Sequence, residues 1–154
     1  MKMYKNKFSL IFLIYLLFLF SGCGNKPEPI NYGNDECEFC RMQITDNRYG
    51  SELVTDKGKV YKFDSIECMV EFAMLKNLIG NSNQTLLVTD FSQPETFINT
   101  NSAFYVMNDN FRSPMGLNVS AFNGAESGQK FVDENGGQIL KWVDVIELVK
   151  QRSM

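Results

Sequence analysis

Two fourteen-residue segments of the chain resemble each other, and this similarity limits the folds available to the chain. Residues 59–72 (KVYKFDSIECMVEF) and 118–131 (NVSAFNGAESGQKF) share valine, phenylalanine, glutamate and phenylalanine at one fixed offset. Asp64 in the first copy stands opposite Asn123 in the second, and both residue types favour the N-cap of a helix. The repeat predicts an internally duplicated chain. Chance similarity between two ordinary hairpin–helix segments is the alternative, and the expected architecture is the same in either case.

The first copy lies within a strand–strand–helix pattern. Apolar and polar residues alternate over 51–56 and 59–63 on either side of a Lys-Gly pair, which predicts a β-hairpin. Asp64 is then placed to cap a helix, and Glu67 occupies the capping-box position three residues later. A further strand is expected over 86–91.

The second half repeats this order after a polar stretch over 92–102. We expect one strand over 103–107 and a second within the second copy of the repeat, followed by a helix that Asn123 caps and a Gly-Gly pair closes. A strand over 138–142 and a short final helix over 143–150 are expected after it. The sequence therefore predicts an α+β protein with two related ββαβ units in tandem, residues 37–100 and 101–154.

The N-terminus has the pattern of an export signal. Three lysines precede an apolar run over 8–20, which is too short to span a bilayer comfortably, and small residues lead to Cys23. The last four of these residues, Phe-Ser-Gly-Cys, resemble the bacterial lipobox. We predict a lipoprotein signal peptide over 1–22, lipidation of Cys23, a short tether over 23–36, and attachment in the cell envelope, facing the periplasm or the cell surface. An ordinary secretory signal is the alternative.

Charge and composition exclude several classes of function. Three of the fifteen basic residues lie within 1–22, so the remainder carries twelve basic against eighteen acidic residues, a net charge of −6. Nucleic acid is a poor partner for such a chain. The sequence contains no histidine, which removes the usual general base and the commonest zinc ligand. Any metal must therefore be bound through sulfur or oxygen.

The sulfur donors are concentrated in one motif, Cys-Glu-Phe-Cys-Arg-Met over residues 37–42. Cys37, Cys40 and Met42 supply two thiols and a thioether within six residues. Soft ligands of this kind select Cu(I), which accepts low coordination numbers.

A zinc site is short of donors on the sequence alone. Structural zinc is normally held by four ligands, mostly cysteine and histidine. Cys68 is the one further thiol beyond the motif and Cys23, and we expect it in the core of the first helix, with a ligand role only in reserve. Recruiting Asp35 or Glu38 would give a weaker mixed site. The sequence favours copper.

Two other readings of the motif stay open. Exported cysteines meet an oxidising compartment, so Cys37 and Cys40 can form a disulfide that staples a surface lipoprotein whose role is to bind a protein partner. The second alternative is a thiol-disulfide oxidoreductase. A redox CxxC normally opens a helix, whereas the residues after Cys40 have an extended pattern, which argues against a thiol-disulfide oxidoreductase.

Taken together, these features resemble the NosL family, copper-binding lipoproteins that are accessory to nitrous oxide reductase in denitrification. The resemblance rests on the lipobox cysteine, the C-x-x-C-x-M motif, the Phe-Asp start of the first helix, and a later Pro-Met-Gly turn over 114–116. It implies a pair of ββαβ domains, similar to the accessory domain of organomercurial lyase, and a non-enzymatic metallochaperone. It also implies Cu(I) ligands at Cys37, Cys40, Met42 and Met115. The implied partner is nitrous oxide reductase or the membrane transporter that loads it.

The motif departs from the family pattern at two positions. The family often has proline and glycine where this chain has Glu38 and Arg41. We expect the side chain of Arg41 to disfavour the positive φ that glycine adopts freely, and its charge to be placed where it can stabilise a neighbouring thiolate.

Overall fold

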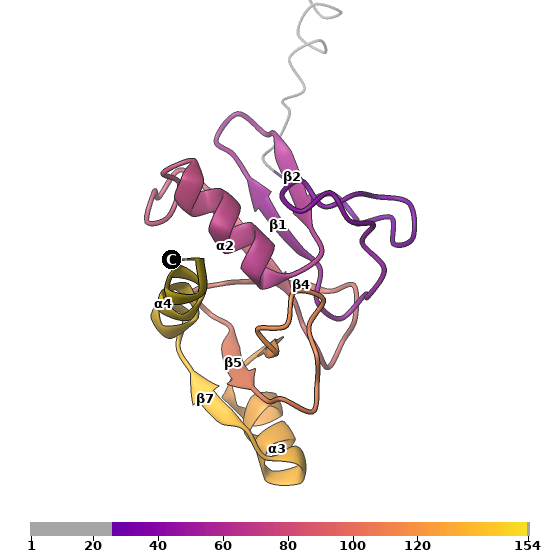
Figure 1. The fold of residues 1–154 in the computed structure, drawn as a ribbon, viewed down its shortest axis with the longest axis vertical. Helices are drawn as coiled ribbons and strands as arrows, with labels where there is room; N and C mark the ends of the chain where they lie inside the picture. The colour runs from indigo at the N-terminus through magenta and orange to yellow at the C-terminus, as the bar shows by residue number, and fades with distance from the viewer. Residues whose placement is uncertain (1–25, 154) are drawn as a thin grey trace, which may run out of the picture.

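The computed structural model describes residues 26–153. Two antiparallel sheets and three helices make up this part of the chain (Figure 1). The elements are β1 (Ser51–Val54), β2 (Val60–Phe63), α2 (Ile66–Leu75), β3 (Thr85–Thr89), β4 (Phe97–Asn99), β5 (Phe104–Met107), β6 (Val119–Phe122), α3 (Ala125–Asn135), β7 (Gln138–Leu140) and α4 (Trp142–Ser153). The signal peptide and the lipidation site at Cys23 fall outside the described residues. None of the three helices is long and apolar enough to cross a bilayer.

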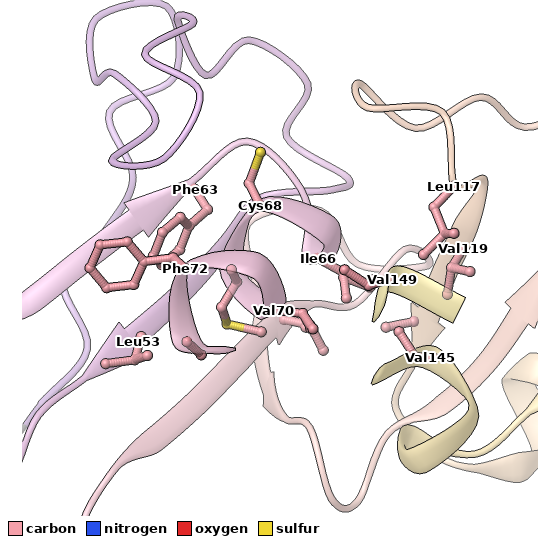
Figure 2. Close-up of a cluster of buried hydrophobic side chains, with 14 of the residues drawn as sticks. Leu53, Phe63, Ile66, Cys68, Val70, Phe72, Leu117, Val119, Val145 and Val149 are labelled. Atoms are coloured by element: carbon pink, nitrogen blue, oxygen red, sulfur yellow. The ribbon is translucent and has the colours of Figure 1, made fainter. Parts of the chain in front are cut away.

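The first sheet has the strand order β2-β1-β3-β4, and α2 covers one of its faces. Leu53 in β1 is paired with Tyr61 in β2 and Leu86 in β3. Because side chains alternate along a strand, Leu53 and Phe63 both point toward α2, where the ring of Phe63 lies 5.3 Å from that of Phe72 (Figure 2). The Lys-Gly hairpin and the helix that follows it are confirmed.

The second sheet has the order β6-β5-β7 and packs against α3. It is joined to the first sheet through the backbone, since the Phe91 amide just beyond β3 donates to the Ala121 carbonyl in β6. The order β1-β2-α2-β3 thus recurs as β5-β6-α3-β7, as the repeat predicts. The sequence did not predict β4, and it placed Trp142 in a strand, whereas Trp142 begins α4 and stacks on Tyr105.

The two halves share one hydrophobic core. In Figure 1, α4 lies beside α2 although it follows β7 in the chain, and the two helices are in contact. Ile66 and Val70 of α2 face Val145 and Val149 of α4 (Figure 2). A change in α2 is therefore felt by both halves of the protein.

The expected helix caps are wrong. The N-cap of α2 is Ser65, whose hydroxyl accepts a hydrogen bond from the Cys68 amide at 3.4 Å. In the second copy the helix begins after Gly124, which caps without a side chain, so Asn123 is not the cap either. The Asp64 side chain is consequently not used as a helix cap, and it lies in the side-chain cluster described below.

Part of the segment expected as a tether, residues 23–36, packs against the folded domain. Ile30 is buried, and the segment that follows lies beside β1 and β2 (Figure 1). Asp35 forms an ion pair with Lys62 of β2 at 2.8 Å, and the same ammonium donates to the Pro29 carbonyl. Residues from about 28 onward therefore contact the folded body and fix the approach to Cys37.

This segment covers a carboxylate on the face of β1 that is turned away from α2. Glu52 is fully buried; its Oε2 accepts a hydrogen bond from the Glu28 amide at 3.2 Å, and its Oε1 has no partner among the described residues. Burial raises the pKa of Glu52 from 4.5 to about 7. Because the folded state holds this proton more tightly than the unfolded state, the contribution of Glu52 to stability falls as the pH rises from 4.5 through 7.

We therefore expect Glu52→Gln to raise the free energy of unfolding by about 2 kcal/mol at pH 8 and to change it little at pH 5. Urea unfolding of both proteins at the two pH values measures this difference. Glu36→Gln is the control, since Glu36 is exposed. An increase in the free energy of unfolding of Glu52→Gln that is equal at both pH values would contradict the raised pKa of Glu52.

Candidate metal site

The cysteine motif forms a tight turn. An isolated antiparallel bridge pairs Glu36 with Gln43. Within it, the Cys37 amide donates to the Met42 carbonyl at 2.8 Å, and the Arg41 amide donates to the Cys37 carbonyl at 3.0 Å. No helix begins at either cysteine, as the sequence indicates. The motif thus lacks the helix N-terminus that activates a redox CxxC.

The turn brings the two thiols to the start of α2. Sγ of Cys37, Cys40 and Cys68 and a carboxylate oxygen of Asp64 all lie within 4.8 Å of one another. We call these four residues the Cys3Asp cluster. Figure 2 shows the Cys68 sulfur pointing away from the hydrophobic side chains that α2 packs into the core. Cys40 is the partly exposed member, so the cluster is open to solvent on its side.

Hydrogen bonds make the three thiols unequal. The Cys68 thiol donates a hydrogen bond to the Cys37 sulfur, as do the backbone amides of Asp64, Cys40 and Phe39. These donors lower the pKa of Cys37 from 9.0 to about 6, although burial of the thiol acts in the opposite direction. Burial, with the neighbouring Cys37 sulfur and Asp64 carboxylate, raises the pKa of Cys40 to about 11. The hydrogen bond to Cys37 and burial also raise the pKa of Cys68. Cys37 is therefore the most readily ionised of the three thiols.

Asp64 has few hydrogen-bond partners for a buried carboxylate. It is 2% exposed, and its Oδ2 accepts a hydrogen bond from Cys40 Sγ at 3.4 Å. Its Oδ1 is buried and has no partner in the described part of the chain. A buried carboxylate with one weak thiol donor carries a desolvation cost that a bound cation offsets. The donor set therefore fits a metal ion.

The structure does not bring all of the sequence-predicted site residues together. Cys37 and Cys40 lie in the cluster, while Met42 follows on the same turn with 47% of its surface exposed. Met115 lines a separate cavity of about 80 Å³. The other residues of that cavity are Glu67, Glu71, Val149 and Arg152. The structure thus groups the two motif cysteines with Cys68 and Asp64.

Sequence reasoning missed Asp64 and gave Cys68 only a reserve role. Both residues fit a helical pattern, Asp64 as a cap and Cys68 as a buried position, and Cys68 is indeed buried. Their spacing of four residues across the start of α2 is the signal that points to a shared side of the helix. Cys37 is fully buried and belongs to the hydrophobic core. All three described cysteines are free thiols.

Arg41 adopts the backbone conformation that glycine favours. Its φ is +65°, in the left-handed region, and its guanidinium pairs with Glu38 at 3.6 Å on the surface. An exposed pair of this kind contributes little, whereas a side chain at this φ carries strain. We expect Arg41→Gly to raise the free energy of unfolding by about 0.5–1 kcal/mol, measured by urea unfolding. Arg41→Ala removes the same ion pair but keeps the strain, so an equal gain from both variants would rule this explanation out.

The chain is similar to known proteins in both sequence and fold. The sequence profile of the NosL family matches residues 30–149. The copper-binding lipoprotein NosL of Stutzerimonas stutzeri is 24% identical over 153 residues, covering 91% of this chain and 80% of that protein. The crystal structure of the copper chaperone NosL from Shewanella denitrificans superposes with a TM-score of 0.63 at 23% identity, covering 77% of this chain and 93% of that chain. Because the profile spans most of the chain, the protein belongs to the NosL family.

Proposed function

We propose that this protein is an exported, lipid-anchored carrier of Cu(I). The observation that supports this most strongly is the meeting of Cys37 and Cys40 in one turn, with the sulfur donors close together and one of them partly exposed. Soft thiolate ligands select Cu(I) over harder cations. The relatives named above as a copper-binding lipoprotein and a copper chaperone support the same reading.

We assign the copper ligands to Cys37, Cys40, Met42 and Met115. The exposed side chain of Met42 lies on the same turn as both cysteines, and methionine has the flexibility to swing toward an ion. Met115 lines its cavity together with Glu67, the residue directly before Cys68 in α2. Cys68 remains the alternative third sulfur. In such a set, Met42 is exposed and Cys40 is partly exposed.

Few and accessible ligands suit handover. A partner that offers competing sulfurs can approach the exposed side of Cys40 and take the ion through shared coordination. The proposed recipient is nitrous oxide reductase or the membrane transporter that loads it. Lipidated Cys23 would hold the carrier in the cell envelope, and no catalytic step is required.

The delivery step is tested by mixing the Cu(I)-loaded chain with copper-free nitrous oxide reductase. We expect the reductase to gain copper from the loaded chain faster than from the same amount of Cu(I) held by a small chelator of equal affinity. The Cys40→Ser variant, offered the same copper, should give no such advantage. If the reductase gains no copper while the chain keeps its own, nitrous oxide reductase is not the direct recipient and the proposed binding stands.

A further inference from the structure

We propose that the folded domain docks on an anionic bilayer through the end of the molecule formed by the β1–β2 turn and the end of α2, with the Cys3Asp cluster facing away from the membrane. The proposal rests on the proposed lipidation of Cys23 and goes beyond it, because a lipid on that residue alone sets no orientation. We call the residues at this end, Lys57, Lys59, Leu75 and Lys76, the basic end.

The path of the N-terminal segment leads to the basic end. The side chains of Ile30 and Tyr32 lie against Gly50, which directly precedes β1. The Glu28 amide donates to Glu52, which lies two residues further along the chain within β1. Followed toward its N-terminus, the segment therefore runs along β1 in the direction of the β1–β2 turn.

The free part of the tether is short. Glu28 is the first described residue with a hydrogen bond to β1, and it follows Cys23 by five positions. Five residues span at most about 18 Å even when fully extended. The Debye length at physiological salt is about 8 Å. A lipid on Cys23 therefore holds the β1–β2 turn close enough to the bilayer for surface charge to act on it.

Three exposed lysines gather at this end of the domain. Lys59 Nζ lies 4.4 Å from the centre of the Tyr61 ring, and Lys76 Nζ lies 5.8 Å from the centre of the Phe72 ring. The centres of the two rings are only 4.8 Å apart. The two ammonium groups therefore flank one aromatic pair that joins β2 to α2, and Lys57 lies in the adjoining turn.

The chemistry of the basic end fits an anionic membrane surface. Leu75 is 72% exposed at the last position of α2, directly before Lys76. Lysines beside an exposed apolar side chain combine attraction to anionic headgroups with contact to the acyl boundary. Asp56 is the one acidic residue in the turn. Residues 23–154 carry a net charge of −6, so the rest of the surface is, on balance, repelled by the same bilayer.

The Cys3Asp cluster lies at the opposite end of the elements that carry these lysines. Asp64 and Cys68 lie at the start of α2, whereas Lys76 directly follows its last residue, and a helix of ten residues is about 15 Å long. In Figure 1 the β1–β2 turn and the end of α2 lie toward the top, and the start of α2 lies near the centre. Docking through the basic end would therefore present the partly exposed Cys40 to the aqueous side.

The test compares the lipidated full-length chain on vesicles of phosphatidylcholine alone and on vesicles that also contain phosphatidylglycerol. An amine-reactive reagent acetylates exposed lysines, and mass spectrometry gives the rate at each position. We expect acetylation of Lys57, Lys59 and Lys76 to slow by at least about threefold on the anionic vesicles, and to recover in high salt. Lys130 and Lys141 are exposed in the second half and serve as internal controls whose rates should stay unchanged.

A pair of charge variants provides a second comparison. The double variant Lys59→Gln and Lys76→Gln should remove the slowing at Lys57, because too little positive charge remains to hold this end on the bilayer. The matched double variant Lys130→Gln and Lys141→Gln should keep it. Neither pair belongs to the proposed copper site, so Cu(I) uptake should be the same in both variants.

Several results would overturn the docking. These are equal slowing at all five lysines, no slowing on the anionic vesicles, or slowing in detergent that grows with protein concentration, which would mean that a second copy covers the basic end. Flotation with phosphatidylcholine vesicles tests the anchor separately. A chain that floats without selective protection is anchored but not docked, and a chain that does not float lacks the anchor and contradicts both proposals.

Discussion

Replacing Cys40 with serine is expected to weaken Cu(I) binding by about tenfold or more, because a soft donor is lost from a site that has few. Cys40 is the partly exposed cysteine of the cluster, and its thiol makes one long hydrogen bond, to Asp64. Serine keeps the size and a hydroxyl donor, so the fold should be retained. Competition with a chromophoric Cu(I) chelator measures the affinity, and thermal unfolding checks the fold.

The same measurement applies to Met42→Leu, which should also lose about tenfold in Cu(I) affinity although leucine has nearly the same volume. Met74→Leu is the matched control, because Met74 packs against the hydrophobic core from α2. Unchanged affinity in both Cys40→Ser and Met42→Leu would show that copper is bound elsewhere in the chain.

The second large effect is on stability. Glu67 projects from α2 to the turn that carries Met115, where its Oε1 accepts hydrogen bonds from the Ser113 hydroxyl at 2.5 Å and from the Leu117 amide at 2.8 Å. Glu67→Ala leaves both buried donors without a partner. We expect the free energy of unfolding to fall by about 3 kcal/mol, measured by urea unfolding. Glu67→Gln keeps an acceptor oxygen and should lose about 1 kcal/mol.

The repeat supplies the control for this prediction. Glu126 is the counterpart of Glu67 in the second copy, and it is exposed. Glu126→Ala should therefore change the free energy of unfolding by less than about 0.5 kcal/mol. Equal losses from Glu67→Ala and Glu126→Ala would mean that the contacts to Ser113 and Leu117 are not the source of the effect.

The sequence predicts the order of the main elements because their signals are local. The hairpin turn is marked by Gly58, whose φ is +76°, and α3 is closed by Gly136 with φ +73°. β4 has only three residues and pairs at the edge of its sheet, so it offers too short a pattern to recognise. The packing of Ile30 was missed for a similar reason, since it is a single apolar residue in a polar segment.

The metal site was only half predictable. Cys37 and Cys40 lie three residues apart in the sequence, and this spacing is a known ligand pattern. Asp64 and Cys68 join them through a long-range contact between the turn and α2 that no local pattern encodes. The similarity of the two repeats also favoured the wrong N-cap assignment. Asp64 and Asn123 are both of residue types that commonly cap helices, but neither is the cap.

The measurement that tests the proposed function most directly is a Cu(I) titration of the full-length chain against a chromophoric competitor, first reduced and then oxidised. The proposed site predicts uptake of about one equivalent of Cu(I) by the reduced protein and none by the oxidised protein, because oxidation pairs the thiolates that bind copper. Failure to bind Cu(I) in either state, with Cys37 and Cys40 joined in a disulfide, would contradict the carrier and leave a disulfide-stapled lipoprotein.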